Sequence, residues 1–221
     1  MNSLKNCYVA FTFCLLLPVS SLWAQNFQQW EKEISALEQQ DKVSPPPRKS
    51  IVFTGSSSIR LWETLNQDFP DKKVLNRGFG GSQTFEVLHF ADRLILPYHP
   101  KQVVIYVGDN DLAAGKTPDQ VLTDFKALFQ KIRSNNRKAY VTFISIKPSP
   151  SRKNLLPVIN QTNHLIQKYL AKQKHSNYVD VYSRMLLSSG KFNPELYRAD
   201  SLHMTAAGYR IWAEAVRPVL K

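Results

Sequence analysis

Residues 51–58 read IVFTGSSS, an apolar run followed by a glycine and three serines. A short, nearly continuous apolar run is typical of a strand buried on both faces of a parallel sheet. Gly55 permits a turn where the strand ends, and residues 59–65 then show a helical pattern. The stretch therefore predicts a strand, a turn and a helix in succession, which is the repeating unit of α/β folds.

The same alternation continues along the chain. Apolar runs with the character of strands lie at 103–107, 140–146 and 178–182, with a weaker one at 73–76. Helical patterns lie between and after them, at 84–95, 117–133, 155–172 and 205–216. Strands joined by helical crossovers run parallel, so we expect a three-layer α/β/α sandwich whose ligands bind at the carboxyl ends of the strands.

Residues 1–24 have the layout of a secretory signal peptide. Lys5 is their one charged residue, an apolar stretch covers 8–17, and Ala24 offers a cleavage point. The apolar stretch is short for a membrane span, although a membrane anchor is the alternative. Both cysteines, Cys7 and Cys14, fall in this segment, so the mature chain has no disulfide and no thiol. We expect an exported protein, periplasmic or extracellular, with no stable membrane span after cleavage.

Residues 25–50 form a separate N-terminal segment ahead of a single domain at 51–221. Apolar residues recur at helical spacing at Phe27, Trp30, Ile34 and Leu37, which predicts an amphipathic helix packed on the domain. Three consecutive prolines at 45–47 then predict that 41–50 is an extended connector.

The net charge of +12 comes from basic residues that are scattered in pairs and triplets. No basic stripe with interleaved aromatics is present, so the sequence favours a solvated basic surface over a nucleic-acid site. Attraction to anionic envelope surfaces is left open.

The three serines at 56–58 allow three interpretations. A serine here could cap the following helix, the Gly/Ser loop could hold a phosphate, or one serine could be a nucleophile. A catalytic serine requires a base, a group that orients the base, and donors for the oxyanion. Of the five histidines, only His203 has a suitable neighbour, because Asp200 lies three residues before it in the stretch DSLH.

Two further stretches offer oxyanion donors. Residues 76–82 read NRGFGGS after the second strand, and their glycines let main-chain N–H groups approach a substrate. Residues 108–111 read GDND after the third strand, where Asn110 can aim its amide N–H at the same point. Each stretch alone could be a simple turn, but together with 55–58 they follow three predicted strands and would meet at one edge.

Taken together, these blocks resemble the SGNH, or GDSL, hydrolase family, from about residue 51 to 212. The resemblance implies a flavodoxin-like sandwich with a parallel five-stranded sheet. It also implies that Ser57 is the nucleophile, His203 the base and then the acid, and Asp200 its orienting partner. The oxyanion hole would comprise the N–H groups of Ser57 and Gly81 and the amide of Asn110. Ser56 stands where the family usually has an aspartate. We expect this replacement to preserve activity, and Ser56 and Ser58 to serve the start of the helix.

The resemblance predicts a secreted serine esterase or acylhydrolase that needs no cofactor or metal. No long apolar lid is evident, so we expect the substrates to be short acyl esters, particularly acetyl esters, of carbohydrates or similar small molecules. We expect segments 147–156 and 187–196 to shape the pocket. The alternatives are a flavodoxin-like protein that binds phosphate or nucleotides, and a carbohydrate-binding relative without catalysis.

Overall fold

The computed structural model describes residues 21–221 and contains one five-stranded parallel sheet. The strand order is β2-β1-β3-β4-β5. The strands are β1 (Ile51–Gly55), β2 (Val74–Gly78), β3 (Gln102–Tyr106), β4 (Tyr140–Ile144) and β5 (Ser176–Val179). The predicted α/β class and parallel five-stranded sheet are confirmed.

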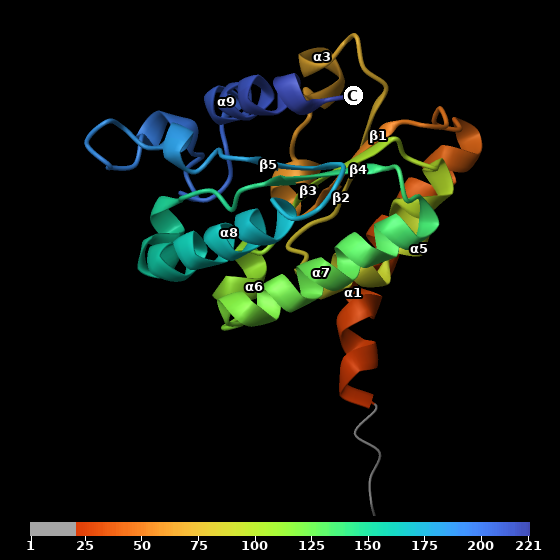
Figure 1. Cartoon of the computed structure of the whole chain (residues 1–221), viewed down its shortest axis with the longest axis horizontal. Helices are drawn as coiled ribbons and strands as arrows, with labels where there is room; N and C mark the ends of the chain where they lie inside the picture. The colour runs from red at the N-terminus through yellow and green to blue at the C-terminus, as the bar shows by residue number, and fades with distance from the viewer. Residues whose placement is uncertain (1–20) are drawn as a thin grey trace, which may run out of the picture.

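Helices cover both faces of the sheet (Figure 1). One face packs against α1 (Ser21–Val43), α4 (Thr84–His89), α5 (Ala91–Leu94), α6 (Asp109–Ala113), α7 (Pro118–Asn135) and α8 (Leu156–Leu170). The other packs against α2 (Ser57–Arg60), α3 (Leu65–Asp68) and α9 (Ala206–Val216). Short 3-10 helices lie at Leu96–Tyr98, Pro150–Leu155, Ser183–Met185, Pro194–Leu196 and Arg217–Val219.

The register aligns the carboxyl ends of three neighbouring strands. Gly55, the last residue of β1, pairs with Gly78 at the end of β2 and with Tyr106 at the end of β3. The segments that follow these strands therefore leave the sheet at the same edge. This alignment brings together the three stretches that the sequence singled out.

Several predicted boundaries are wrong for reasons visible in the packing. The helix expected at 84–95 is divided at Phe90, whose ring is fully buried against Phe79. The strand expected at 178–182 ends at Val179, because the hydroxyl of Ser145 accepts the N–H groups of Val181 and Tyr182, two and three residues further on.

Two helical patterns also differ in extent. The pattern at 59–65 forms the two short helices α2 and α3, between which Trp62 turns its indole N–H to Asp68 at 2.7 Å. Helix α1 continues to Val43, beyond the expected start of the connector, because Asp41 is held by Arg77 and Tyr98.

Helix α1 is firmly attached to the domain. Ile34 is fully buried in the core of one face. Arg93 of α5 binds Glu31 and Glu38 at 2.8 Å each. Of the predicted signal peptide, residues 1–20 lie outside the described part of the chain, and 21–24 begin α1. Within residues 21–221, no helix has the length and apolarity needed to cross a membrane.

Candidate active site

The end of β1 places Ser57 in an unusual turn. Gly55 has φ of 128°, and a Cβ there would lie 1.8 Å from the carbonyl oxygen of Tyr106. Only glycine fits both this conformation and this close approach to β3. The chain then turns at Ser56 and begins α2 with Ser57. Ser56 occupies the N-cap position, but its side chain makes no capping hydrogen bond, contrary to the role expected for it.

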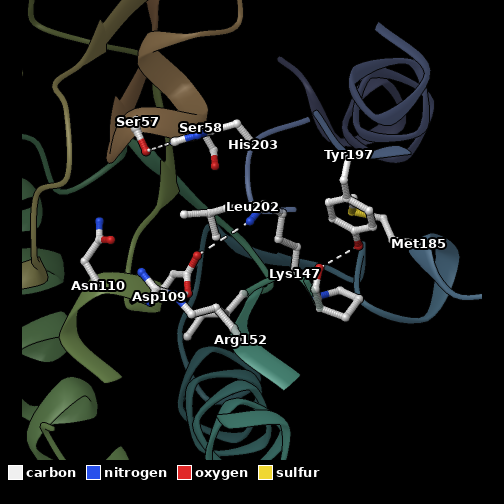
Figure 2. Close-up of polar contacts among 12 residues, drawn as sticks. Ser57, Ser58, Asp109, Asn110, Lys147, Arg152, Met185, Tyr197, Leu202 and His203 are labelled. Carbon is white, nitrogen blue, oxygen red and sulfur yellow. Dashed lines mark hydrogen bonds and ion pairs between the residues drawn. The ribbon is translucent and has the colours of Figure 1, made fainter. Parts of the chain in front are cut away.

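Ser57, His203 and Asp200 form a continuous chain of hydrogen bonds. His203 Nε2 lies 2.9 Å from Ser57 Oγ, as Figure 2 shows. His203 Nδ1 lies 2.6 Å from Asp200 Oδ2. With Nδ1 donating to the carboxylate, Nε2 is the nitrogen that accepts the proton of the serine hydroxyl. The structure thus brings together the three residues that the sequence proposed as a catalytic set.

The loop before α9 holds Asp200 in place by its own main chain. Asp200 Oδ1 accepts the N–H groups of Leu202 and His203 at 2.9 Å each, and Ser201 adopts a left-handed conformation with φ of 56°. Burial acts to raise the pKa of Asp200, but the hydrogen bonds from His203 and these two N–H groups outweigh it and lower the pKa to about 2. Asp200 is therefore a carboxylate at any pH near neutrality.

The predicted oxyanion donors lie at the same edge of the sheet. Asn110, in the first turn of α6, donates one amide hydrogen to the carbonyl oxygen of Ser82 at 3.1 Å, and no acceptor among the described residues takes its second hydrogen. Gly81 has φ of 68°, in the left-handed region. Within residues 21–221, no protein acceptor takes the main-chain N–H of Ser57 or Gly81. Backbone donors without a protein partner next to a serine are what an oxyanion requires.

Two side chains that the sequence did not assign to the site fix the helix that carries Ser57. Asn76 Nδ2 donates to the carbonyl oxygen of Ile59 at 2.7 Å, while its Oδ1 accepts the N–H of Gly78 at 3.0 Å. The hydroxyl of Tyr209 in α9 donates to the carbonyl oxygen of Ser58 at 2.9 Å. Helix α2 has only four residues, so these long-range bonds replace the stability that a longer helix would have.

A buried charge cluster includes Asp109, the residue before Asn110, and the sequence did not reveal it. Lys147 is fully buried, and its Nζ lies 3.5 Å from Asp109 Oδ2, while Arg152 Nε lies 3.5 Å from Asp109 Oδ1. Figure 2 shows Asp109 next to Lys147 and Arg152, with the contact between Asp109 and Lys147 dashed. Burial lowers the pKa of Lys147, although the Asp109 carboxylate opposes this shift. The cluster fixes the first turn of α6, in which Asn110 directly follows Asp109.

Replacing Asp109 by asparagine is expected to destabilise the fold by about 3–5 kcal/mol, because Lys147 loses its buried counter-charge. The double variant Asp109→Asn/Lys147→Met should recover part of this loss, since the fully buried charge is then removed and only the partly exposed Arg152 loses its partner. Urea unfolding at constant pH measures the free energy of unfolding of both variants. A matched control is Asp92→Asn, which breaks an exposed pair with Lys131 and should cost at most about 1 kcal/mol. Equal stability of Asp109→Asn and the wild type would contradict a paired charge at Lys147.

The other four histidines are all exposed and are absent from this chain of hydrogen bonds. His89 stacks on Phe27 with ring centroids 3.7 Å apart, and His175 packs edge-on against Tyr140. His99 and His164 lie in a loop and on α8. In the described residues, no group of three or more histidine, cysteine or acidic side chains is placed to hold a metal ion.

A serine hydroxyl, an imidazole and a carboxylate in series at the edge of a parallel sheet are typical of hydrolases that act on esters. Residues 50–211 match the GDSL-like Lipase/Acylhydrolase family, so the chain belongs to this family and is a hydrolase of ester substrates.

Individual relatives agree with this assignment. The chain is 30% identical over 176 residues to the Homo sapiens platelet-activating factor acetylhydrolase IB subunit alpha1, covering 77% of this chain and 74% of that one. A GDSL-like lipase structure from Bacteroides thetaiotaomicron is similar with a TM-score of 0.68 at 23% identity, over 87% of this chain and 96% of that one. A carbohydrate esterase family 3 structure from Talaromyces cellulolyticus is similar with a TM-score of 0.60 at 15% identity, over 77% and 95%. The two structural likenesses show a shared fold.

Proposed function

We propose that this protein is an exported serine esterase that cleaves carboxylic esters through an acyl-enzyme at Ser57. The observation that carries the proposal is the chain of hydrogen bonds from Asp200 through His203 to Ser57. A phosphate-binding role for the Gly/Ser turn would not explain why Asp200, His203 and Asn110 lie at the same site.

The geometry supports a two-step reaction. Ser57 Oγ attacks the ester carbonyl carbon while His203 Nε2 takes the hydroxyl proton. Negative charge that develops on the carbonyl oxygen is stabilised by the N–H groups of Ser57 and Gly81 and by the amide of Asn110. The tetrahedral intermediate then collapses, and His203 gives its proton to the departing alcohol. Water attacks the acyl-enzyme by the reverse sequence of proton transfers and releases the acid.

Short acyl esters, particularly acetyl esters of carbohydrates, are the substrates that we propose. A long acyl chain needs a continuous apolar surface beside the nucleophile. Among the described residues, however, the large apolar side chains that are exposed are Val43 and Leu187. The human relative is an acetylhydrolase by name and the fungal structure is a carbohydrate esterase, which supports the same substrate class.

A series of p-nitrophenyl esters from acetate to palmitate, tested beside acetylated glycans, examines this substrate class. We expect kcat/KM to be highest for acetate and to fall steadily with chain length. Release of acetate from an acetylated glycan would support the carbohydrate assignment. A maximum at long chains would refute the preference for short acyl groups, and glycan binding without ester cleavage would favour a non-catalytic relative.

The acyl-enzyme is tested by a serine-directed phosphonate. The expected result is a single adduct on Ser57, located by peptide mass spectrometry, and no adduct in Ser57→Ala. Ser58 provides an internal comparison, because its side chain is buried and it should not react. An adduct that persists in Ser57→Ala would overturn the assignment of the nucleophile.

Export is part of the proposal and has its own test. Cells that express the full chain are fractionated, and the N-terminus of the purified protein is sequenced. We expect a mature protein that begins near Gln25 and is found outside the cytoplasm. A protein that retains Met1 in the cytoplasmic fraction would contradict export.

A further inference from the structure

Helix α1 contacts the loop that carries the proposed oxyanion donor Gly81. This helix ends at Val43, before residue 50, where the family match begins. Although α1 is not part of the sheet, its side chains contact the loop that follows β2. The sequence predicted only that α1 would pack on the domain through its apolar residues, so these polar contacts are an additional finding.

Glu33 of α1 joins both segments that supply main-chain oxyanion donors. Its Oε2 accepts the N–H of Gly80 at 3.2 Å. Its Oε1 lies 3.6 Å from Nε of Arg60, the last residue of the helix that begins with Ser57. A carboxylate that accepts an N–H and faces a guanidinium is held by two charge-assisted contacts. One side chain thus connects the loop of Gly81 to the helix of Ser57.

Trp30, which lies one helical turn before Glu33 in α1, contacts the same loop. The indole lies against Gly81, since its Cη2 is 3.4 Å from the position that a Cβ on Gly81 would occupy. The ring also packs edge-on against Phe79, with centroids 5.5 Å apart. Trp30 therefore lies against the loop near its middle, while Glu33 fixes the direction of the neighbouring N–H.

The helix is attached to the domain independently of these contacts. Glu31 and Glu38 bind Arg93, and Asp41 binds Arg77 and Tyr98. None of these anchors involves Glu33 or a residue of the loop at 79–83. Removing the carboxylate of Glu33 should therefore free the loop without detaching α1.

We propose that Glu33 is a positioning residue, through which α1 holds the Gly80–Gly81 loop in the geometry that stabilises the oxyanion. This inference rests on the proposed esterase function. Glu33 does not touch the substrate. It acts by keeping the N–H of Gly81 aligned before the reaction begins, which makes the donor more effective than one that must be ordered in the transition state.

The test compares three variants of the full-length mature protein with p-nitrophenyl acetate as substrate. Glu33→Ala should lower kcat about 3- to 10-fold, the effect of losing one aligned hydrogen bond, and should leave KM within about twofold. Glu33→Gln should retain most of kcat, because its amide oxygen still accepts the N–H of Gly80. Glu38→Ala, which removes a carboxylate of the same helix that pairs with Arg93, should match the wild type.

A second measurement does not depend on turnover. Amide hydrogen exchange of Gly80, whose N–H donates to Glu33, should be faster in Glu33→Ala than in the wild type and unchanged in Glu38→Ala when followed by NMR. The proposal is overturned if Glu33→Ala keeps both the wild-type kcat and the wild-type exchange. It is also overturned if Glu38→Ala shows the same losses, because α1 would then act only through its docking. If the wild type hydrolyses no ester, the esterase proposal fails, and the exchange measurement still decides whether Glu33 holds the loop.

Discussion

Substitution of Ser57 by alanine is expected to lower kcat for p-nitrophenyl acetate by about 10⁵- to 10⁶-fold, the loss that is typical when the nucleophile of a hydrogen-bonded triad is removed. No other described hydroxyl is placed to replace it, since the imidazole of His203 is hydrogen-bonded to Ser57 Oγ at 2.9 Å. The remaining rate would come from substrate binding and the oxyanion donors alone. Stopped assays at high enzyme concentration measure it.

His203→Ala should cause a loss of similar size, and the double variant Ser57→Ala/His203→Ala should be no slower than either single variant. Residues that act as one unit do not have additive effects, because the first removal already disables the other. His164→Ala, an exposed histidine on α8, is the matched control and should retain full activity. Multiplicative losses in the double variant, or unchanged turnover in His203→Ala, would refute the role of His203 as the base.

Asp200→Asn is expected to lower kcat by about 10³- to 10⁴-fold while the protein stays folded. Asparagine can present an amide N–H to His203 Nδ1, which would favour the tautomer that carries its proton on Nε2. That tautomer cannot accept the proton of Ser57. Asp180→Asn, which changes an exposed carboxylate bonded to Ser183 on a neighbouring loop, is the control and should be close to wild type.

The pH dependence of Asp200 follows from its lowered pKa. A carboxyl group whose folded pKa is depressed to about 2 stabilises the fold at pH above its usual value of about 4, and this contribution is lost as the pH falls through 2. Because the side chain is 48% exposed, solvent screens the effect on stability and it should be small. A carbon-13 NMR titration of the Asp200 carboxyl should therefore show a midpoint well below pH 4. A midpoint near 4 would show that His203 does not hold this carboxylate.

Much of the fold could be predicted because its signals are local. The apolar run at 51–55 and the helical pattern at 117–133 depend on residues close in sequence. The boundaries that were wrong depend on distant partners. After β5, the N–H groups of Val181 and Tyr182 donate to Ser145 of another segment, and a helix is divided where Phe90 enters the core.

In the candidate site, too, some relations follow from local sequence and others depend on distant residues. Asp200 and His203 lie three residues apart, so a single turn brings them together, and the sequence was sufficient to relate them. Ser57 is 146 residues from His203, and two indications related them: the expectation of parallel strands ending at one edge, and the resemblance to the SGNH family.

By itself, the sequence determined the class of fold, the edge of the sheet where chemistry would occur and the residues proposed to perform it. The tertiary structure alone decided which residues support that chemistry. Glu33 is 47 positions from Gly80, and Lys147 reaches Asp109 from the segment after β4. A periodic pattern reports which face of an element is buried, but not which polar group lies opposite a given side chain. That depends on how separate elements pack, and packing is a property of the folded chain.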